Sequence, residues 1–429
     1  MKVLIVDPYG DCLDLAMRAL DAGHAVVHYV SDSDKKYALV GEGLTDPVRD
    51  FKPHVRDADL IFLADNTKWL HFFDGVRAEY PNKAVFGPTW ATAQWEQDRL
   101  LGMKVLEAHG IECPPTRTFN TADEAIKYVR KHDGRLVCKP CGDADKALSY
   151  VSKAPEDMEY MLKKWDSCGK IRSKFILQDF IEGVEFAVGS YCGRDGFGGG
   201  WEENFEHKKL MPKEIGTQTG EMGTVLMVTG KSKLASMVLE PLEKALVEDG
   251  FTGDIDVNCI VDEKGKPWPL EFTCRPGYPA LQIQQPLFPD DPVQWMYDLC
   301  KTGKSPKFTK GIVSAGVSMC LAPFPYDSAP ADLSQGFPIF GVTPFNRDKL
   351  HPYHIQAGCD CSEWMTAGQY AMVVTGTSGS VSQASDNCYR TLKQLIIPGD
   401  VLYRHDIGDK LSKFLPELHE HGFATGFTY

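Results

Sequence analysis

The sequence predicts an α/β fold built from more than one domain. Short apolar segments alternate with turns and helix-like segments over the first 90 residues, a pattern typical of a doubly wound β/α unit. Helix and strand patterns alternate again over residues 116–186, in a compact α+β lobe. The length of 429 residues is about three times that of a ~150-residue domain. We therefore expect two or three hydrophobic cores.

The first 90 residues contain the clearest strand patterns. Consecutive apolar residues predict strands at 3–6, 25–29, 60–63 and 84–88. A helix is predicted over residues 12–22. The turn before this helix holds one glycine, Gly10, whereas a dinucleotide-binding loop needs three for close approach of phosphate. This excludes an NAD-binding loop.

The middle of the chain is expected to begin with one long helix. Its pattern runs from Thr92 to a C-cap at Gly110, and two prolines at 114–115 then impose an extended segment. In the lobe over 116–186, helices are predicted at 123–131 and 156–165 and strands at 135–139 and 175–180.

The remaining segments complete the predicted domain organisation. Residues 193–217 are rich in glycine and are interpreted as loop and hairpin. A helix is predicted at 232–249, and strands at 253–261 and 268–273 flank a charged turn that suits a β-hairpin. A third region has predicted strands at 312–321 and 370–375 and a helix at 382–395. The predicted domains are residues 1–90, residues 91–310 with a lobe at about 116–186, and residues 311–429.

Composition and charge narrow the classes of function. Hydrophobic residues make up 43% of the chain, aromatic residues 11% and charged residues 24%, which excludes a disordered chain. Lys and Arg number 46 against 59 Asp and Glu, a net charge of −13. This balance disfavours an extended nucleic-acid or anionic-membrane surface and leaves small phosphorylated ligands open.

Cysteine usage and hydropathy indicate the compartment. The 13 cysteines are scattered without a short repeating spacing, which fits reduced thiols better than a disulfide framework. The first residues lack a secretory apolar region, and no stretch of about 18 uncharged apolar residues occurs. We therefore expect a cytoplasmic protein without a membrane segment.

A candidate phosphate-binding lysine lies at the end of a predicted strand. Lys139 ends the strand 135–139, where its ammonium could neutralise a phosphate beside a short polar loop containing Gly142, Asp143 and Lys146. The alternative is an ordinary edge lysine. Cys138 and Cys141 form a C-x-x-C pair there, but a redox or zinc role needs a partner pair or a helix start that the sequence does not contain.

The predicted hairpin carries a second candidate cluster. Asp254, Asp256 and Asn258 alternate along one strand, and Glu271 and Thr273 alternate along the next. Alternation places each set on one face, and such oxygens are the hard ligands that Mg²⁺ takes together with substrate phosphates. The alternative is a solvated hairpin face, which we favour for Asp254. Glu271 lies between two apolar residues, so its carboxylate is expected to need a cation.

A third candidate cluster has the residue types of a zinc site. His351 and His354 form H-x-x-H, and Cys359 and Cys361 form C-x-C. The spacing does not closely match a known zinc class, and histidines in such a loop more often serve in packing and hydrogen bonding. We favour the packing interpretation.

Taken in order, these segments resemble the ATP-grasp ligases, and specifically the glycinamide ribonucleotide synthetase (phosphoribosylamine–glycine ligase) family. The resemblance runs through VFGPTWATAQWEQDRLLGMKVLEAHGI, LVCKPCGDADKALSYV, ILQDFIEGVEFAV, EHKKL, TGEMGT, FTGDIDVNCIVDEKGKPWPLEFTCRPG and VTGTSGSVSQASDNCYRTLKQLI with YRHDIG. It implies an ATP-grasp fold with a Rossmann-like N-terminal (pre-ATP-grasp) domain and a small C-terminal α+β domain.

The resemblance implies a role for each matching residue. For ATP it implies the set Arg99, Lys139, Lys146, Gln178, Asp179, Ile181 and Glu185. For magnesium it implies Glu271 and Thr273, which Asn258 or Asp256 of the paired strand would assist. For the acceptor it implies His207, Lys208, Gly220 and Gly223, with Arg404 nearby. Arg275, Lys146 and Lys208 take the catalytic positions.

The implied reaction joins glycine to phosphoribosylamine. ATP, with Mg²⁺ or possible Mn²⁺, converts the carboxylate to an acyl phosphate, and the amine then displaces phosphate to give glycinamide ribonucleotide and ADP. Positioning and charge neutralisation carry such a step, and exclusion of water gives the lobe at 116–186 a reason to close as a lid. The expected partners are small molecules, with monomer and dimer both open.

Three departures from the family pattern keep alternatives open, and one of them is a phosphate loop that is poorer in glycine. The N-terminal turn, residues 7–12, has no basic side chain to meet a ribose phosphate. On the metal strand Thr273 replaces an amide ligand, and Tyr278 and Ala280 stand where the family has acids. The alternatives are therefore a ligase for another amine acceptor, such as a modified nucleotide or an amino compound, and an inactive binding homologue.

Overall fold

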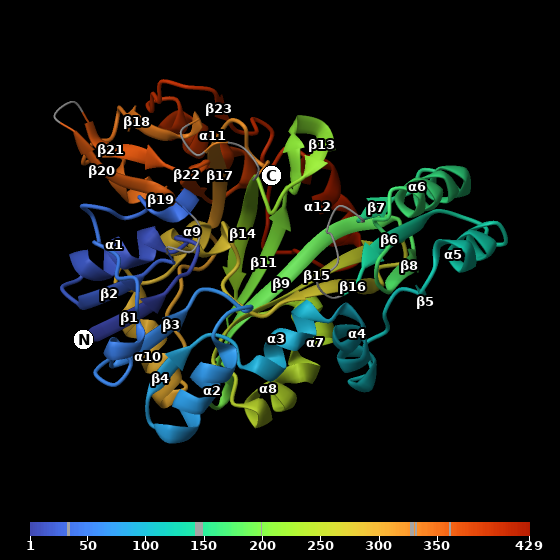
Figure 1. Ribbon diagram of the computed structural model, residues 1–429, viewed down its shortest axis with the longest axis horizontal. Helices are drawn as coiled ribbons and strands as arrows, with labels where there is room; N and C mark the ends of the chain where they lie inside the picture. Colours follow the sequence, from blue (N-terminus) through green and yellow to red (C-terminus); the bar gives the residue numbers. More distant parts are fainter. Residues whose placement is uncertain (32–34, 142–148, 199, 327–329, 331–332, 360–361) are drawn as a thin grey trace. The chain divides into compact units, whose positions relative to one another are not determined.

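A computed structural model describes residues 1–429 except 32–34, 142–148, 199, 327–329, 331–332 and 360–361 (Figure 1). The chain divides into two compact units. The larger unit comprises Met1–Ala93, Phe186–Asp256 and Thr273–Tyr429, and the smaller unit comprises Gln94–Glu185 and Val257–Phe272. The C-terminal residues 311–429 thus fall in the same compact unit as the first 93 residues.

The N-terminal part of the larger unit is a four-stranded parallel sheet with the order β2-β1-β3-β4. Its strands are β1 Lys2–Val6, β2 Ala25–Tyr29, β3 Leu60–Leu63 and β4 Ala84–Phe86, and its helices are α1 Leu13–Asp21 and α2 Leu70–Glu79. α10, Pro292–Thr302, packs against β4 and contributes Trp295 to the core that holds Phe62 and Phe86. The predicted doubly wound unit is confirmed, because apolar runs this short and continuous suit strands buried on both faces.

The larger unit also contains most of a long sheet with the order β15-β9-β11-β14-β17-β22-β19. These strands are β15 Gly253–Asp262, β9 Gly183–Gly193, β11 Trp201–Glu206, β14 Gly223–Thr229, β17 Val313–Leu321, β22 Tyr370–Ser378 and β19 Leu350–Pro352; β10 Gly196–Phe197 pairs with β9 and β23 Val401–Leu402 with β17. α11, Val381–Leu392, packs along β17 and β22 (Figure 1).

Smaller elements complete this unit. They are the hairpin of β12 Lys209–Met211 and β13 Ile215–Gln218, the sheet of β18 Gln335–Ile339, β21 Ser362–Ala367 and β20 Ile355–Cys359, and the helices α7 Lys233–Val238, α8 Glu243–Asp249, α9 Ala280–Gln284 and α12 Leu411–Glu420.

The smaller unit contains an antiparallel sheet with the order β5-β8-β6-β7. Its elements are α4 Arg99–Ala108, β5 Thr116–Phe119, α5 Ala122–Val129, β6 Leu136–Pro140, β7 Tyr150–Val151, α6 Pro155–Ser167 and β8 Phe175–Asp179. α5 and α6 share one apolar core with the alternate residues Leu136, Cys138, Phe175 and Leu177. β16, Pro267–Thr273, neighbours β15 and confirms the predicted hairpin. The predicted α+β alternation is also confirmed.

Two predicted long helices are each divided. The helix predicted from Thr92 to Gly110 is α3, Trp90–Gln97, followed by α4, because the Asp98 carboxylate accepts hydrogen bonds from the backbone of Leu100 and Leu101 and starts a new helix. The helix predicted at 232–249 is α7 and α8 with a 3₁₀ turn at Glu240–Leu242 between them. Pro241 in that turn lacks the N–H that a continuous helix needs.

The interpretation of residues 193–217 as loop and hairpin is wrong in one important part. Trp201–Glu206 forms β11, which pairs with β9 on one side and β14 on the other and is buried along most of its length. Gly196, Gly198 and Gly200 come shortly before this strand, and their pattern predicted a loop instead of a strand. The predicted hairpin is confirmed as β12 and β13.

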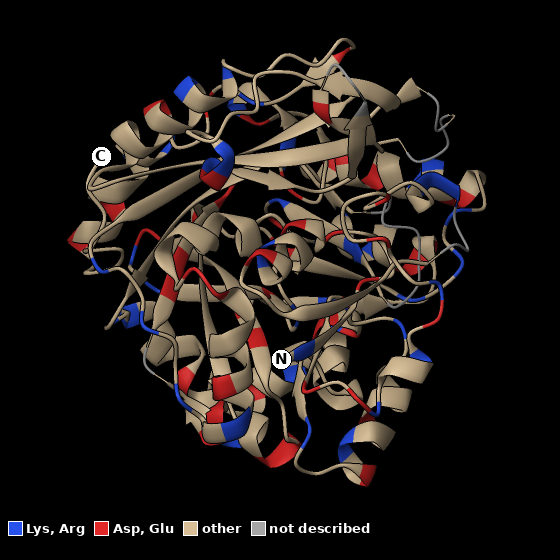
Figure 2. Cartoon of the chain, turned by 90° about the vertical axis from the view of Figure 1, so that its left-hand side faces the viewer, with Lys and Arg blue, Asp and Glu red and all other residues tan. Residues whose placement is uncertain are grey.

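Charged residues of both signs occur on the face of the chain drawn in Figure 2. Figure 2 shows Lys and Arg interspersed with Asp and Glu over the helices and connecting segments of the visible face. None of the helices that the structure describes is both long and apolar enough to cross a membrane.

Candidate active site

The outer face of the lobe sheet presents the predicted phosphate-binding lysine. β6 and β8 pair so that Val137 faces Gln178 and Lys139 faces Ile176, on the side opposite the apolar core. Lys139 Nζ donates to Gln178 Oε1 at 3.0 Å, and Gln178 Nε2 donates to Thr116 Oγ1 at 2.9 Å. Gln178 is thereby fixed in orientation, and it holds the ammonium at the surface of the sheet.

The other residues of the predicted adenine set follow at the end of β8. Asp179 Oδ1 lies 3.6 Å from His132 Nε2, and its backbone N–H donates to Pro115 O. Ile181 is half-buried in the segment that leads to β9. Lys146, Gly142 and Asp143 lie outside the described residues, so their predicted roles remain predictions.

The predicted ribose-binding acid, Glu185, accepts a hydrogen bond from the neighbouring strand. Asn258 Nδ2, on β15, donates to Glu185 Oε1, on β9, at 3.1 Å. Both side chains belong to the smaller unit. The pair fixes one carboxylate oxygen of Glu185, which is half-buried. It also shows Asn258 orienting an acid, a contact that the predicted metal role did not include.

An ion pair joins two further predicted residues. Arg99 Nη2 lies 3.3 Å from Glu271 Oε2, and Arg99 Nη1 donates to the carbonyl of Leu270 at 3.3 Å. Asp98, the N-cap of α4, sets where Arg99 leaves the helix. The Glu271 side chain is 43% exposed, so the flanking apolar residues do not bury it. The cation that we expected for Glu271 is the guanidinium of Arg99.

A buried group of acidic side chains lies in the larger unit. Alternate residues Glu202 and Asn204 of β11 share one face, and Asn204 Nδ2 donates to Asp256 Oδ2 of β15 at 2.9 Å. Burial raises the pKa of Glu202 well above its usual range, and the negative charges of Asp254 and Asp256 raise it further. Burial therefore favours the neutral form of the Glu202 carboxyl on this face.

The two aspartates of β15 are also affected by burial. Burial raises the pKa of Asp254 to about 7, and burial together with Glu206 raises the pKa of Asp256 to about 8. The solvated position that we favoured for Asp254 is therefore wrong. Its side chain is buried because β15 runs beside β9 within the sheet.

The predicted acceptor-side residues are brought together by backbone hydrogen bonds. His207 N donates to Gly223 O at 3.0 Å, and Met222 N donates to His207 O at 2.9 Å. The strand pairing leaves Gly223 at φ +151°, where a Cβ would lie 2.4 Å from Gly316 O, so only glycine fits. Lys208 Nζ lies 2.8 Å from Glu206 Oε2. Gly220 belongs to the connecting loop.

His207 and Arg404 are buried in a polar network behind this loop. His207 Nε2 accepts the backbone N–H of Gly408 at 3.2 Å, and burial lowers the pKa of His207 well below its usual range, so the ring is neutral. Arg404 is 1% exposed, and its guanidinium donates to Asp406, Glu214 and the Lys209 carbonyl. These partners occupy Arg404, and its predicted role with a ligand anion remains a prediction.

Arg275 and Thr273 lie at the end of β16. Arg275 Nη1 donates to the Pro276 carbonyl at 2.9 Å, and its guanidinium carbon lies 5.7 Å from the centre of the Tyr278 ring. Thr273 is half-buried. Their predicted catalytic and metal-binding roles remain predictions.

The N-terminal turn has its own carboxylate where a bound anion would sit. The backbone N–H groups of Gly10, Asp11 and Cys12 donate to the Asp7 carboxylate at 3.0, 2.9 and 2.7 Å. His28 Nε2 lies 3.1 Å from Asp7 as well. Successive backbone N–H groups of this kind are the donors that a phosphate uses at a helix start, and here Asp7 already uses them.

A cavity of about 240 Å³, which we call the aromatic cavity, opens beside this turn in the larger unit. Its lining includes Tyr37, Tyr278, Phe324, Tyr353 and Tyr370, together with Asp11, Glu221, Lys36 and His354. Gly220 of the acceptor-side loop lines it as well.

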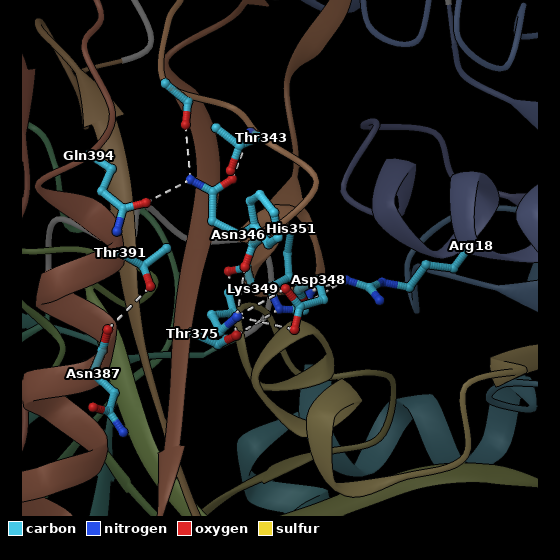
Figure 3. Close-up of polar contacts among 12 residues, drawn as sticks. Arg18, Thr343, Asn346, Asp348, Lys349, His351, Thr375, Asn387, Thr391 and Gln394 are labelled. Carbon is cyan, nitrogen blue, oxygen red and sulfur yellow. Dashed lines mark hydrogen bonds and ion pairs between the residues drawn. The ribbon is translucent and has the colours of Figure 1, made fainter.

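A second cavity of about 550 Å³, the polar cavity, has a different lining. It includes Arg18, Asp348 and Lys349, with Arg390 and several hydroxyl and amide side chains of β22 and α11. Figure 3 shows these polar groups bonded to one another: Arg18 reaches the Asp348 carbonyl, and Lys349 pairs with the Asp348 carboxylate at 3.0 Å.

The zinc alternative receives no support from the described residues. His351 is buried, and its ring bonds to Asp14 at 2.9 Å and to Thr375 at 3.0 Å, as expected for a packing histidine. The Cys359 side chain and Cys361 lie outside the described part of the chain. Among the residues that are described, no three His, Cys, Asp or Glu side chains are placed to hold a metal ion. The eleven cysteines described with their side chains are free thiols, Cys138 and Cys141 included.

Sequence reasoning missed several side chains of the larger unit. They are Glu202 and Asn204 on β11 and Tyr353 and Tyr370 around the aromatic cavity. The alternating acidic and amide residues of WEENFE were the available signal for β11. The cavity residues come from segments far apart in sequence, and no local pattern connects them.

The sequence is similar to a known family of ligases. Residues 99–280 match the family model for the phosphoribosylglycinamide synthetase ATP-grasp (A) domain. Phosphoribosylamine–glycine ligase from Vibrio parahaemolyticus is 25% identical over 339 residues, which cover 76% of this chain and 77% of the relative. The enzyme of the same name from Escherichia coli O6:H1 is 24% identical over 430 residues, covering 95% of this chain and 98% of the relative.

Solved structures show the same fold. Phosphoribosylamine–glycine ligase from Thermotoga maritima has a TM-score of 0.72 at 17% identity and covers 95% of this chain and 100% of its own. Biotin carboxylase from Campylobacter jejuni has a TM-score of 0.63 at 13% identity, covering 99% of this chain and 98% of its own. The chain therefore has the ATP-grasp fold, as predicted.

Proposed function

We propose that this ATP-grasp ligase, which resembles phosphoribosylamine–glycine ligase, activates a carboxylate with ATP and joins it to an amine. The names of the relatives supply the first candidate substrates, glycine and phosphoribosylamine. The observation that carries the proposal is the polar surface of the smaller unit, where Lys139, Glu185 and Glu271 each contact a neighbouring polar side chain. These residues lie within the segment that matches the ATP-grasp model.

The proposed reaction has two bond-forming steps. A carboxylate oxygen attacks the γ-phosphorus of ATP, and the bond between that phosphorus and the ADP oxygen breaks. The amine nitrogen then attacks the acyl carbon, a C–N bond forms, and the C–O bond to phosphate breaks while the nitrogen releases its proton. The protein contributes positioning and charge neutralisation to such transfers.

The residues of the smaller unit fit a nucleotide with its metal. Lys139 and Arg99 would neutralise phosphates, and Glu185 would accept hydrogen bonds from ribose hydroxyls. Glu271 offers the hard oxygen that Mg²⁺ prefers, and the metal would withdraw charge from the phosphates. The remaining ATP and metal roles proposed from the resemblance are those of Lys146, Gln178, Asp179, Ile181, Thr273, Asn258 and Asp256.

Trapping the activated carboxylate tests this proposal without knowledge of the acceptor. The full chain is incubated with ATP, Mg²⁺, glycine and hydroxylamine, a small amine that attacks acyl phosphates. We expect ADP and glycine hydroxamate in equal amounts, and loss of both when glycine is omitted. ADP without hydroxamate across a panel of carboxylates would show an ATPase, and no ADP with any of them would favour an inactive binding homologue.

One observation favours a second candidate, a ligase for another amine. Asp7 occupies the backbone N–H groups of the N-terminal turn, and Asp11 adds a carboxylate beside them. A ribose phosphate brought to this turn would meet negative charge, and the backbone N–H groups of Gly10, Asp11 and Cys12 are already bonded to Asp7. Replacing phosphoribosylamine by unphosphorylated amines in the ADP-release assay separates the two candidates.

We also propose that the protein works in the cytoplasm. The eleven described cysteine side chains are free thiols, and most of them are buried in apolar surroundings, as a reducing compartment permits. Small-molecule substrates fit the ligase assignment.

A further inference from the structure

The aromatic cavity has walls of interlocked rings. Tyr353 packs against Tyr370 with ring centres 4.5 Å apart and against Tyr278 at 6.1 Å, and Phe324 adds a contact to Tyr370 at 5.9 Å. Tyr37 packs edge-on against the His354 ring at 5.5 Å, and the His354 ring in turn lies 6.0 Å from that of Tyr353. Because each ring is held by a neighbour, the walls are preorganised for a flat or compact ligand.

Three buried polar atoms in this lining have no hydrogen-bond partner among the described residues: His354 Nε2 and one atom each of Glu221 and Tyr353. Glu221 is 5% exposed and its Oε1 has none, and Tyr353 is 2% exposed and its hydroxyl has none. An unmet buried acceptor or hydroxyl costs about 1 to 3 kcal/mol. All three atoms belong to residues that line the cavity, so a ligand with N–H donors would remove that cost.

The charges around the cavity favour a cation. Asp11 and Glu221 provide two carboxyls and Lys36 one ammonium, with the Asp11 carboxylate 3.7 Å from His354. Burial raises the pKa of Glu221 well above its usual range; Glu206 and Asp256 raise it further, while Lys208 and Lys410 lower it. An ionised Glu221 is therefore costly until a positive charge lies beside it.

We propose that the aromatic cavity binds the acceptor as an organic cation, a protonated amine carried on a flat or compact body without a phosphate. Glu221 accepts a hydrogen bond from the ammonium and then its proton, so that the neutral amine has the lone pair that attacks the acyl carbon, and the tyrosine faces contact its body. Aromatic faces attract cations through their negative quadrupoles. The inference rests on the proposed function, since it names the substrate class of the same amine-joining reaction.

The same features disfavour a phosphate in this cavity. A phosphate dianion would lie near Asp11 and Glu221, and the backbone donors of the neighbouring turn are already bonded to Asp7. Desolvating such an anion without paired cations is prohibitive. The polar cavity differs from the aromatic cavity in that it has basic side chains, but two of them, Arg18 and Lys349, are already paired with Asp14 and Asp348.

A matched set of probes tests the proposal by calorimetry on the full chain. Benzylamine supplies a protonated amine on an aromatic ring, benzyl alcohol is its neutral counterpart, and ribose 5-phosphate carries the phosphate. We expect benzylamine to bind at least tenfold more tightly than either of the other two. Equal binding of benzylamine and benzyl alcohol would overturn the role of charge, and tighter binding of ribose 5-phosphate would overturn the substrate class.

Variants locate the binding in the cavity. Glu221→Gln should remove at least tenfold of the preference for benzylamine over benzyl alcohol, and Tyr353→Phe, which keeps the ring, should reduce it by less. Arg390→Ala in the polar cavity is the matched control and should leave binding unchanged. If Glu221→Gln does not fold, Tyr353→Phe and Tyr370→Leu remain as tests, because the first removes a hydroxyl that lines the cavity and the second removes a ring face, and both losses should weaken binding of the cation. An unchanged affinity in all folded cavity variants would overturn the proposal.

The outcomes separate this inference from the proposed ligase. ADP formation with glycine and phosphoribosylamine, without a preference for benzylamine, would keep the ligase and overturn the cavity assignment. Preferential benzylamine binding without hydroxamate formation from any carboxylate would keep the cavity assignment and overturn the ligase. Amide formation between glycine and an unphosphorylated amine, lost in Glu221→Gln, supports both.

Discussion

The two compact units handle charge in opposite ways. In the smaller unit, Arg99 and Glu271 form a partly exposed ion pair, and the Lys139 ammonium donates to the amide of Gln178. In the larger unit, carboxyls gather behind the acceptor-side loop, where burial raises the pKa of Asp254 to about 7 and of Asp256 to about 8. In the smaller unit, a polyanionic ligand can replace the weak polar contacts of these cations. In the larger unit, the buried carboxyls would gain from a ligand with positive charge.

This difference teaches which ligand each unit can stabilise. A surface ion pair contributes about 0 to 1 kcal/mol, so a nucleotide phosphate or metal can replace it at little cost. A buried carboxyl without a cation is far more costly when ionised. The larger unit therefore gains most from a ligand that brings positive charge, and the smaller unit gains most from one that brings negative charge.

The largest expected effect is on catalysis by Glu271. Glu271→Gln keeps the shape and a hydrogen-bond acceptor for Arg99 but loses the charge that would hold magnesium, so ADP formation should fall about a hundredfold. Because the side chain is 43% exposed, the free energy of unfolding should change by less than about 1 kcal/mol. Steady-state ADP release and urea denaturation measure both. Full activity with the amide would place the metal on other residues.

The next effect is on nucleotide affinity. Lys139→Ala removes the ammonium from the outer face of the lobe sheet, and ATP affinity should fall by about tenfold to a hundredfold, the value of a charged hydrogen bond of about 1.5 to 3 kcal/mol. Lys127→Ala, on the exposed side of α5, is the matched control and should bind ATP normally. Calorimetric titration distinguishes the two variants, and normal ATP binding by Lys139→Ala would contradict the assignment.

The third effect concerns the pH dependence of stability in the larger unit. The ordinary pKa of these aspartates is 3.8, whereas in the folded chain it is about 7 for Asp254 and about 8 for Asp256. Between these limits the folded state retains protons that the unfolded state has lost. The contribution of Asp254 and Asp256 to the free energy of unfolding is therefore complete below about pH 4. It is lost as the pH rises through the pKa values of these groups in the folded chain.

Asp256→Asn should remove part of this dependence. The amide oxygen can still accept the Asn204 hydrogen bond, and no charge forms at high pH. The variant should gain at least about 1.4 kcal/mol relative to the unaltered chain at about pH 8.5, the value of one pKa unit, and gain little at about pH 4. Urea denaturation at the two pH values measures it, with the exposed Asp290→Asn as control. Parallel profiles for all three proteins would contradict the buried charge.

Local patterns predicted the fold where local physics decides it. The strands at 25–29 and 60–63 coincide with β2 and β3 because short apolar runs have few alternatives in a β/α unit. β11 was not predicted because its buried polar side chains depend on partners from other segments of the chain. Asn204 donates to Asp256 of β15, and Ser232 donates to Glu203 at 2.6 Å.

Candidate site residues divide in the same way. Lys139, Glu185 and Glu271 were predicted because each lies on a strand whose pattern is visible in the sequence, and the structure gives each of them a polar partner. The aromatic cavity was not predicted, because Glu221 and Tyr353 lie more than a hundred residues apart in the sequence and only the fold brings them to one cavity. The hydrogen bonds from the backbone of the N-terminal turn to the Asp7 carboxylate were also not predicted, because they depend on the three-dimensional path of the turn.

The smallest expected effect lies at the helix break that the sequence analysis missed. Asp98 caps α4 by accepting the backbone N–H groups of Leu100 and Leu101 at 3.0 and 3.2 Å. Asp98→Ala should lower the free energy of unfolding by about 1 kcal/mol, whereas Asp98→Asn, which can still cap, should cost less. Because the cap also sets the position of Arg99, Asp98→Ala should weaken ATP binding by less than tenfold, a smaller loss than that of Lys139→Ala. Urea denaturation and ATP titration of the two Asp98 variants measure this, and equal stability of both would show that α3 and α4 are divided by packing instead of by the cap.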